Sequence, residues 1–179
     1  TFKPTDFTQV NTAINQKMIA RVMELLDPKP TDVILDLFCG IGNFTLPLAR
    51  KAAHVTGVEG SSEAVERARL NAERNGLENT VFYVADHSKS VEGAPWVDQA
   101  FDKILLDPSR AGALEILEQI PGWKPSRIVY VSCNPSTLAR DAGVLVHDHG
   151  YRLEGAGVMD MFPQTAHVES LALFEKAGR

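Results

Sequence analysis

The sequence predicts an α/β fold in which a parallel β-sheet is covered by helices on both faces. Short apolar runs of strand length alternate along the chain with longer stretches of helical periodicity. No internal repeat or linker-like segment interrupts this alternation, and 179 residues suffice for one domain with a full core. We therefore expect a single domain that spans residues 1–179.

The first half of the chain is predicted to contain a helix over residues 11–26, a strand over 33–37, a helix over 44–51, a strand over 54–59 and a helix that begins at residue 62. Asn11 is the predicted cap of the first helix, and Ser61 or Ser62 that of the third. Asn75 and Gly76 are expected to close the third helix in a left-handed turn.

The second half is predicted to add five strands, over residues 81–86, 101–107, 127–133, 151–158 and 170–175. A helix is expected between the third and fourth of these strands, running to about residue 147 and ending at Gly150. Strands that alternate with helices in this way are typical of a parallel sheet buried on both faces.

Polar residues lie where the predicted strands end. They are Asp36, Glu59, Asp86, Asp107 and Cys133. In open sheets of this class, the ligand site lies outside the carboxyl ends of the strands. The sequence therefore predicts that this edge of the sheet is the functional site.

Composition narrows the class of protein. The net charge is −5 and the positive residues are scattered, which argues against a stand-alone RNA-binding domain. The apolar runs are too short to cross a bilayer, no signal peptide is evident, and the two cysteines, Cys39 and Cys133, form no CxxC pair. We expect a cytoplasmic protein, and because the chain starts at Thr1 we expect it to be the C-terminal part of a longer polypeptide.

A glycine-rich loop, DLFCGIGNF, joins the first strand to the second helix. Gly40 and Gly42 let the backbone turn sharply and approach a ligand, but Thr45 stands where a dinucleotide fingerprint has its third glycine. A tight strand-to-helix turn is the alternative interpretation. Glu59, at the end of the second strand, could accept hydrogen bonds from the ribose of either NAD or S-adenosylmethionine. The acidic edge suits a sulfonium cation, which favours S-adenosylmethionine.

Six motifs together resemble the bacterial RNA (uracil-5-)-methyltransferase family. They are FTQVN (7–11), DLFCGIGNFTLPLA (36–49), GVE (57–59), LLDPSRAG (105–112), VYVSCNPSTLARD (129–141) and HVESLALF (167–174). The members that make 5-methyluridine in 23S ribosomal RNA are the most similar, with the tRNA enzymes as the near alternative. The resemblance covers nearly the whole chain but only the catalytic domain of that family.

The resemblance implies a Rossmann-like, seven-stranded methyltransferase fold with the last strand antiparallel, and S-adenosylmethionine as cofactor. It assigns Cys133 as the nucleophile and Glu169 as the base. The cofactor residues by motif are Gln9, Phe38, Gly40, Gly42, Asn43, Glu59, Asp86 and Asp107. The chain reads DPSR where the family often has DPPR or DPAR, and the family's RNA-binding barrel and iron–sulfur cluster have no counterpart here. RNA binding is therefore expected to need other domains, and no metal is predicted.

The reaction explains why the family needs a thiol and a carboxylate. Carbon 5 of uracil is a poor nucleophile until a thiolate adds to carbon 6, so Cys133 is expected to have a lowered pKa and an open path to the substrate. After methylation, a base must remove the carbon 5 proton, and Glu169 is the candidate. The plainer alternatives are a packed thiol at Cys133 and a solvated carboxylate at Glu169.

Four other functions remain open at this point. An amino-group methyltransferase would have an aromatic residue where this chain has Arg110, and a cytosine-5 enzyme would have Pro-Cys or Thr-Cys instead of Ser-Cys. A non-catalytic cofactor-binding module would not need Cys133 and Glu169. Thr45 disfavours an NAD oxidoreductase.

Overall fold

The computed structural model of the chain describes residues 12–160 and 168–178. Within these ranges the strands form one seven-stranded sheet in the order β3-β2-β1-β4-β5-β7-β6. The strands are β1 (Val33–Leu37), β2 (His54–Glu59), β3 (Thr80–Val84), β4 (Lys103–Leu106), β5 (Arg127–Ser132), β6 (Tyr151–Met159) and β7 (Glu169–Lys176). Neighbours from β3 to β5 pair in parallel, whereas β7 runs antiparallel to both β5 and β6. The predicted fold class is confirmed.

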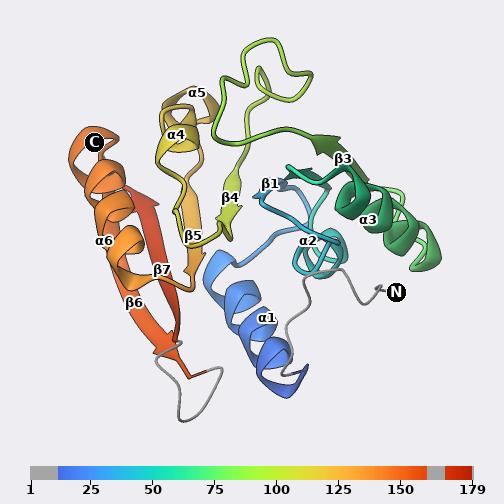
Figure 1. The fold of residues 1–179 in the computed structure, drawn as a ribbon, viewed down its shortest axis with the longest axis horizontal. Coiled ribbons are helices and arrows are strands. Elements are labelled where there is room, and N and C mark those ends of the chain that lie inside the picture. Colours follow the sequence, from blue (N-terminus) through green and yellow to red (C-terminus); the bar gives the residue numbers. More distant parts are fainter. Residues whose placement is uncertain (1–11, 161–167, 179) are drawn as a thin grey trace.

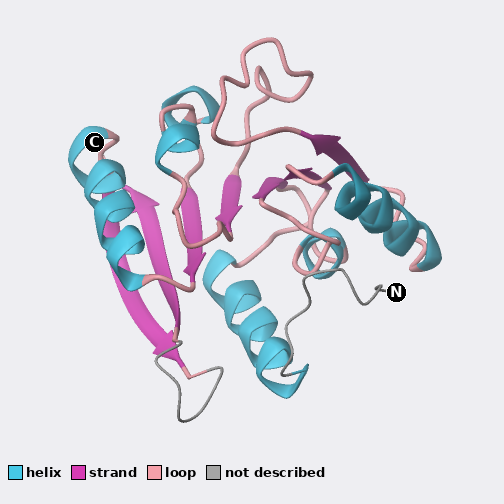
Figure 2. Cartoon of the chain, viewed as in Figure 1, coloured by secondary structure: helices cyan, strands magenta, loops and turns pink. Residues whose placement is uncertain are grey.

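Helices cover both faces of the sheet, as Figure 2 shows. They are α1 (Thr12–Leu26), α2 (Thr45–Ala49), α3 (Ser62–Arg74), α4 (Leu114–Leu117), α5 (Ile120–Trp123) and α6 (Pro135–Gly143), which continues as a π-helical turn, η1 (Val144–Asp148). Figure 1 shows how these elements follow one another along the chain. None of the helices in the described ranges is long and apolar enough to span a membrane.

Each central strand sends alternate residues into two separate cores, because successive side chains point to opposite faces. Ile34, Leu105 and Val129 pack under α1 and α2. Their neighbours in sequence pack on the other face, against α4, α5 and α6; they include Leu35, Leu106 and Ile128. This is why these strands are apolar along nearly their whole length, as two-sided burial requires.

Local signals in the sequence account for most element ends. The Ser61 hydroxyl accepts a hydrogen bond from the Ala64 amide at 3.3 Å and caps α3, and Gly76 follows α3 with a φ of 65°. Asn134 caps α6 by accepting a hydrogen bond from the Ser136 amide at 3.1 Å. The predicted cap Asn11 lies outside the described residues.

The short helices α4 and α5 were not predicted from the sequence. Each is four residues long, so neither has room for the apolar periodicity that marks a helix in a sequence. They fill the connection between β4 and β5, where Ile116, Leu117 and Trp123 are fully or almost fully buried. This connection is therefore packed core rather than an open loop.

The strand β6 forms one edge of the sheet. Its residues are exposed from Arg152 to Val158, and a register shift interrupts its pairing with β7 between Leu153 and Gly155. The edge strand is thus irregular, whereas the central strands β1, β4 and β5 pair without a register shift.

Gly57 in β2 marks a close contact inside the core. A Cβ at this position would lie 2.7 Å from the Phe82 ring and 3.0 Å from the Cys39 sulfur, and both side chains are buried. We expect Gly57→Ala to lower the free energy of unfolding by about 1–3 kcal/mol because the core must shift to admit the methyl group. Denaturant unfolding followed by circular dichroism measures the change.

The matched control is Gly122→Ala in α5. A Cβ there meets no atom within 4 Å, so alanine should stabilise the helix by up to about 1 kcal/mol. Equal effects of the two substitutions would contradict the packing described for Gly57.

Candidate active site

The glycine-rich loop, residues 38–44, leaves β1 in an unusual backbone conformation. Phe38, Gly40 and Gly42 all have positive φ, at 64°, 53° and 90°. A Cβ on Gly42 would lie 2.4 Å from the Leu46 side chain, so glycine is needed there for space as well as for conformation. A Cβ on Gly40 would meet nothing within 4 Å, so the loop is open at that point.

Glu59 holds this loop at the end of β2. One carboxylate oxygen accepts a hydrogen bond from the Gly40 amide at 3.1 Å, and the other accepts from the Ser61 amide at 2.9 Å. The side chain therefore joins the glycine-rich loop to the start of α3. Each oxygen keeps a further lone pair for a ligand.

Asp36 does not lie at the open edge of the sheet, contrary to the sequence analysis. It is the penultimate residue of β1 and its side chain is fully buried. The Thr45 hydroxyl donates to one carboxylate oxygen at 2.5 Å, and the other oxygen has no partner among the described residues. Burial, reinforced by the charge of Glu59, raises the pKa of Asp36 to about 7. Thr45, which stands in the place of a third glycine, thus ties the start of α2 to β1 through this hydrogen bond.

The residues after β3 lie beside the glycine-rich loop. Asp86 is exposed and bonded locally, to the Ser88 hydroxyl at 2.7 Å and to Lys89 at 2.9 Å, and these contacts lower its pKa. The ring of His87 stacks on Phe38, with centroids 3.9 Å apart. His87 is buried, and burial lowers its pKa. A histidine at this position carries no sequence signal of its own, and the sequence analysis missed it.

Asn43 ends the glycine-rich loop and joins it to α1. Its side-chain amide exchanges two hydrogen bonds with that of Asn15, at 3.0 and 3.1 Å. The predicted cofactor residue Gln9 lies outside the described residues.

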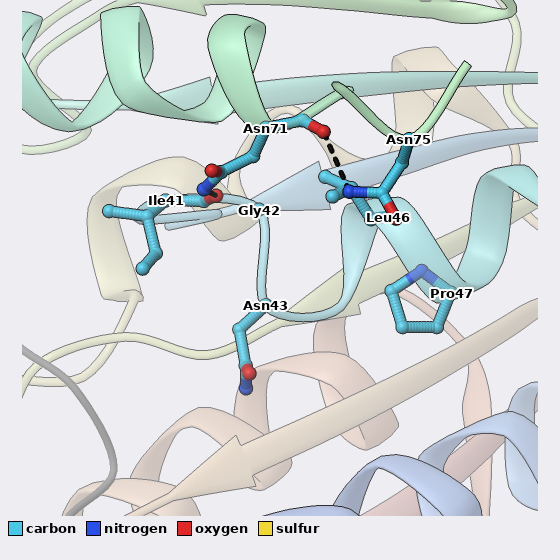
Figure 3. Close-up of a pocket in the computed structure, with 7 residues that line it drawn as sticks. All are labelled: Ile41, Gly42, Asn43, Leu46, Pro47, Asn71 and Asn75. Atoms are coloured by element: carbon cyan, nitrogen blue, oxygen red, sulfur yellow. Dashed lines mark hydrogen bonds between the residues drawn. The ribbon is translucent and has the colours of Figure 1, made fainter. Parts of the chain in front are cut away.

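A pocket of about 270 Å³ lies between this loop, α2 and α3 (Figure 3). Asn71 closes one side of it by donating to the Ile41 carbonyl at 3.1 Å, and Asn75 donates to the Asn71 carbonyl at 2.8 Å. The pocket includes Gly42 and Asn43 from the predicted cofactor residues, and Leu46 and Pro47 from α2. It is separate from the ends of β4 and β5.

The pairing of β5 with β7 brings Cys133 and Glu169 together. Ser132 pairs with Ser170 in this antiparallel ladder, so the next position places Cys133 opposite Glu169. Asp107 follows β4 directly, and its amide donates to the Leu37 carbonyl at 3.3 Å. The charge of Glu169 acts on both Asp107 and Cys133. Three titratable groups from three strands thus meet at this edge.

Burial governs the acidity of these groups. It raises the pKa of Glu169, and it raises that of Asp107 well above the ordinary value, with Glu169, Asp36 and Glu59 adding to the effect. The expectation of a lowered pKa at Cys133 is wrong for this structure, because burial and the charge of Glu169 raise it. The charge of Arg110 and its hydrogen bond oppose them without prevailing.

Cys39 is buried, and burial raises its pKa well above that of a free thiol, so it is unsuited to nucleophilic chemistry. Within residues 12–160 and 168–178, no cluster of His, Cys, Asp or Glu could hold a metal ion. What the edge offers is a partly exposed thiol facing a carboxylate of raised pKa, next to a loop open to a ligand.

The chain matches the family described as tRNA (uracil-5-)-methyltransferase over residues 2–177. It belongs to this family. It is 66% identical to the 23S rRNA (uracil(1939)-C(5))-methyltransferase RlmD of Methylococcus capsulatus over 175 residues, which are 98% of this chain and 40% of that protein. It is 60% identical to the RlmD protein of Xanthomonas axonopodis pv. citri, covering 98% of this chain and 39% of that one.

A solved structure of the same family has the same architecture. The tRNA (uracil-54, C5)-methyltransferase of Pyrococcus abyssi, in complex with S-adenosyl-L-homocysteine, superposes with a TM-score of 0.82 at 34% identity. The superposition covers 97% of this chain and 41% of that protein. The chain thus spans about two fifths of the length of the relatives it matches.

Asp36 should give this family member a stability that depends on pH. Its folded-state pKa of about 7 exceeds its ordinary 3.8, so the stability from protonated Asp36 is full below about pH 4 and is lost as the pH rises through 7. Asp107 and Glu169 are shifted in the same direction. We expect the free energy of unfolding to fall between pH 5 and 8, and Asp36→Asn to reduce this fall by up to roughly 3 kcal/mol.

Denaturant unfolding at a series of pH values measures this slope, with Asp86→Asn as the control. The pKa of Asp86 is lowered, so its contribution is lost only as the pH falls below about 4, and its removal should leave the slope between pH 5 and 8 unchanged. A slope in Asp36→Asn equal to that of the wild type would refute the raised pKa.

Proposed function

We propose that this chain is the catalytic domain of an S-adenosylmethionine-dependent RNA (uracil-5-)-methyltransferase that methylates carbon 5 of a uridine in 23S ribosomal RNA. The observation that carries the proposal is the pairing of β5 with β7, which sets Cys133 opposite Glu169 in a member of the family. A thiol directly after the end of β5 and a carboxylate at the start of β7 suit addition to a pyrimidine ring followed by proton removal.

The glycine-rich loop and Glu59 fit S-adenosylmethionine. The free space beside Gly40 admits a ligand against the backbone, and Glu59 is already oriented by the Gly40 and Ser61 amides to accept hydrogen bonds from a ribose. Phe38, braced by His87, offers a ring for the adenosine. The Pyrococcus relative was solved with S-adenosyl-L-homocysteine, which supports the assignment. When bound, S-adenosylmethionine supplies an electrophilic methyl group.

Asn43, Asp86 and Asp107 complete the proposed cofactor residues, with Gln9 added by motif alone. The Asp107 amide is hydrogen-bonded to the carbonyl of Leu37, the last residue of β1 before the glycine-rich loop. The charges of Glu169, Asp36 and Glu59 add to burial in raising the pKa of Asp107, so a cation bound beside Asp107 would be favoured. This electrostatic setting suits a sulfonium ion.

Cys133 acts first in the proposed sequence. Its thiol gives up a proton and its sulfur adds to carbon 6 of the uracil, which leaves carbon 5 nucleophilic. Its proton passes to solvent, so that Glu169 stays ionised for the later step, and the neighbouring cation Arg110 favours the thiolate against burial and the charge of Glu169. Carbon 5 takes the methyl group, and the electron pair of the broken sulfur–methyl bond stays on the cofactor's sulfur. Glu169 then removes the carbon 5 proton, and the electrons of that bond re-form the ring double bond as the Cys133 sulfur leaves carbon 6.

The RNA class follows from the relatives. Proteins that are 59–66% identical to this chain are named as 23S ribosomal RNA enzymes, which favours ribosomal RNA and with it a cytoplasmic location. A transfer RNA substrate is the second candidate, because the Pyrococcus relative at 34% identity acts on tRNA. With a net charge of −5 and about two fifths of its relatives' length, this chain is expected to depend on further domains to hold RNA.

Glu59→Ala should weaken binding of S-adenosylmethionine to this chain by about 1–3 kcal/mol, through loss of charge-assisted hydrogen bonds to the ribose. Isothermal titration calorimetry measures the affinity. Glu63→Ala, at an exposed position in the same helix–loop region, is the matched control and should bind as the wild type does. Equal affinities in the two variants would contradict the cofactor assignment.

The two catalytic roles separate in a chimera that joins this chain to the rest of the Methylococcus relative. Cys133→Ala should abolish methyl transfer and any covalent complex with RNA, since nothing can add to carbon 6. In Glu169→Gln, the thiol should still add to carbon 6 and the methyl group should still reach carbon 5. The carbon 5 proton would stay in place, so the Cys133 sulfur could not leave, and methylated RNA would remain bonded to the protein.

Denaturing gels with labelled S-adenosylmethionine should show a labelled protein–RNA adduct for Glu169→Gln and none for Cys133→Ala. Mapping of 5-methyluridine in ribosomal and transfer RNA identifies the substrate. An adduct in Cys133→Ala, or release of 5-methyluridine by Glu169→Gln at the wild-type rate, would overturn the proposed roles.

A further inference from the structure

Three side-chain hydrogen bonds fasten the loop after β4, residues 107–113, to the segment that follows Cys133. The side-chain amide of Asn134 donates to the Arg110 carbonyl at 3.1 Å, and the Arg140 guanidinium donates to the Ala111 carbonyl at 2.9 Å. Asp141 accepts from the Ala113 amide at 2.7 Å. We call these three contacts the latch.

Asp141 is the centre of the latch and is fully buried. The oxygen that accepts from Ala113 also accepts from the Tyr130 hydroxyl at 2.6 Å, and the other oxygen pairs with Arg140 at 2.7 Å. Tyr130 belongs to β5, three positions before Cys133. One carboxylate therefore ties the strand that ends at Cys133, the helix that follows it and the loop after β4 to one another.

The loop backbone lies directly against this carboxylate. A Cβ on Gly112 would stand 2.5 Å from the Arg140 guanidinium and 2.7 Å from the Asp141 carboxylate. Only glycine leaves room for the latch at this distance. On the other side, the Ser132 hydroxyl accepts from the Asn134 amide and donates to the Asn134 carbonyl, each at 3.0 Å, so the turn that holds Cys133 is fixed as well.

We propose that Arg140 and Asp141 are positioning residues, which hold the loop bearing Asp107 and Arg110 against the turn bearing Cys133. The role rests on the proposed function, because it matters only if Cys133 is reactive. Its consequence is that Arg110, an exposed residue on a loop, stays beside the thiol. The charged neighbours of Cys133 are Glu169 from β7, which raises its pKa, and Arg110 from this loop, which lowers it.

Substitutions in the latch should change the pKa of Cys133. The direction expected from loss of the latch is opposite to the direction expected from the removed charge alone. Asp141→Asn removes a negative charge, which by itself would lower the pKa of a nearby thiol. If the latch holds Arg110 in place, the same substitution frees Arg110 and raises the pKa instead. Arg140→Lys keeps the charge but loses the fork that reaches both Asp141 and Ala111, so a direct charge effect predicts no change and the latch predicts a rise.

The experiment measures the rate of iodoacetamide alkylation of Cys133 against pH in this chain, with peptide mass spectrometry separating Cys133 from buried Cys39. The midpoint of the profile reports the pKa, and the plateau reports access. We expect both variants to move the midpoint upward by roughly 0.5–1 unit. Arg110→Gln removes the charge that the latch positions. In that background, neither Asp141→Asn nor Arg140→Lys should move the midpoint further.

Asp32→Asn is the control, because it breaks a buried ion pair with Lys103 at the opposite end of the sheet and should leave the midpoint unchanged. Circular dichroism checks folding. Should Asp141→Asn not fold, Arg140→Lys decides alone, since Arg140 is exposed. An unchanged or lowered midpoint in Arg140→Lys would overturn the latch. Alkylation needs neither RNA nor cofactor, so this result stands apart from the outcome of the methylation assays.

Discussion

Because β7 runs antiparallel between β5 and β6, the first residue of β7 lies at the edge of the sheet where β1, β4 and β5 end. A one-residue slip in such a ladder would turn every side chain of β7 to the opposite face of the sheet, because side chains alternate between faces with a period of two. The register of Ser132 with Ser170 thus fixes Glu169 opposite Cys133. The glycine-rich loop after β1 and the loop after β4 reach the same place only because the parallel strands end there. The rest of the candidate site depends on this one pairing.

This arrangement brings several carboxyl groups together, and their charges oppose the ionisation of Asp36 and Asp107. Asp36 and Asp107 are raised in pKa chiefly by burial and further by neighbouring carboxylates, while exposed Asp86 is stabilised in its charged form by Ser88 and Lys89. Burying acids without enough positive partners lowers the stability of the fold near neutral pH. Such local instability is common where a protein is organised for binding or chemistry rather than for folding alone.

Periodicity and strand-end polarity were enough to predict the strands, the α/β class and the edge at which Glu59, Asp107 and Cys133 lie. Sequence could not show that Asp36 turns inward to Thr45, because that depends on which face of β1 its side chain takes and on how α2 packs. Nor could it show that burial outweighs Arg110 at Cys133, since the balance depends on distances between loops. The His87–Phe38 stack joins residues 49 positions apart and leaves no pattern in the sequence. The catalytic roles of Cys133 and Glu169 and the cofactor-binding roles of all the residues named for them stay predictions.

The irregular edge strand β6 bears on how this chain behaves at high concentration. An edge strand exposes backbone donors and acceptors that can pair with a second molecule and begin aggregation. In β6 the register shift near Gly155 disturbs the hydrogen-bonding row, and Arg152 and Glu154 place charges beside it. Flat, continuous and uncharged edges are the ones that add further strands. The register shift and these charges therefore make β6 a poor template for pairing with a second copy of this chain.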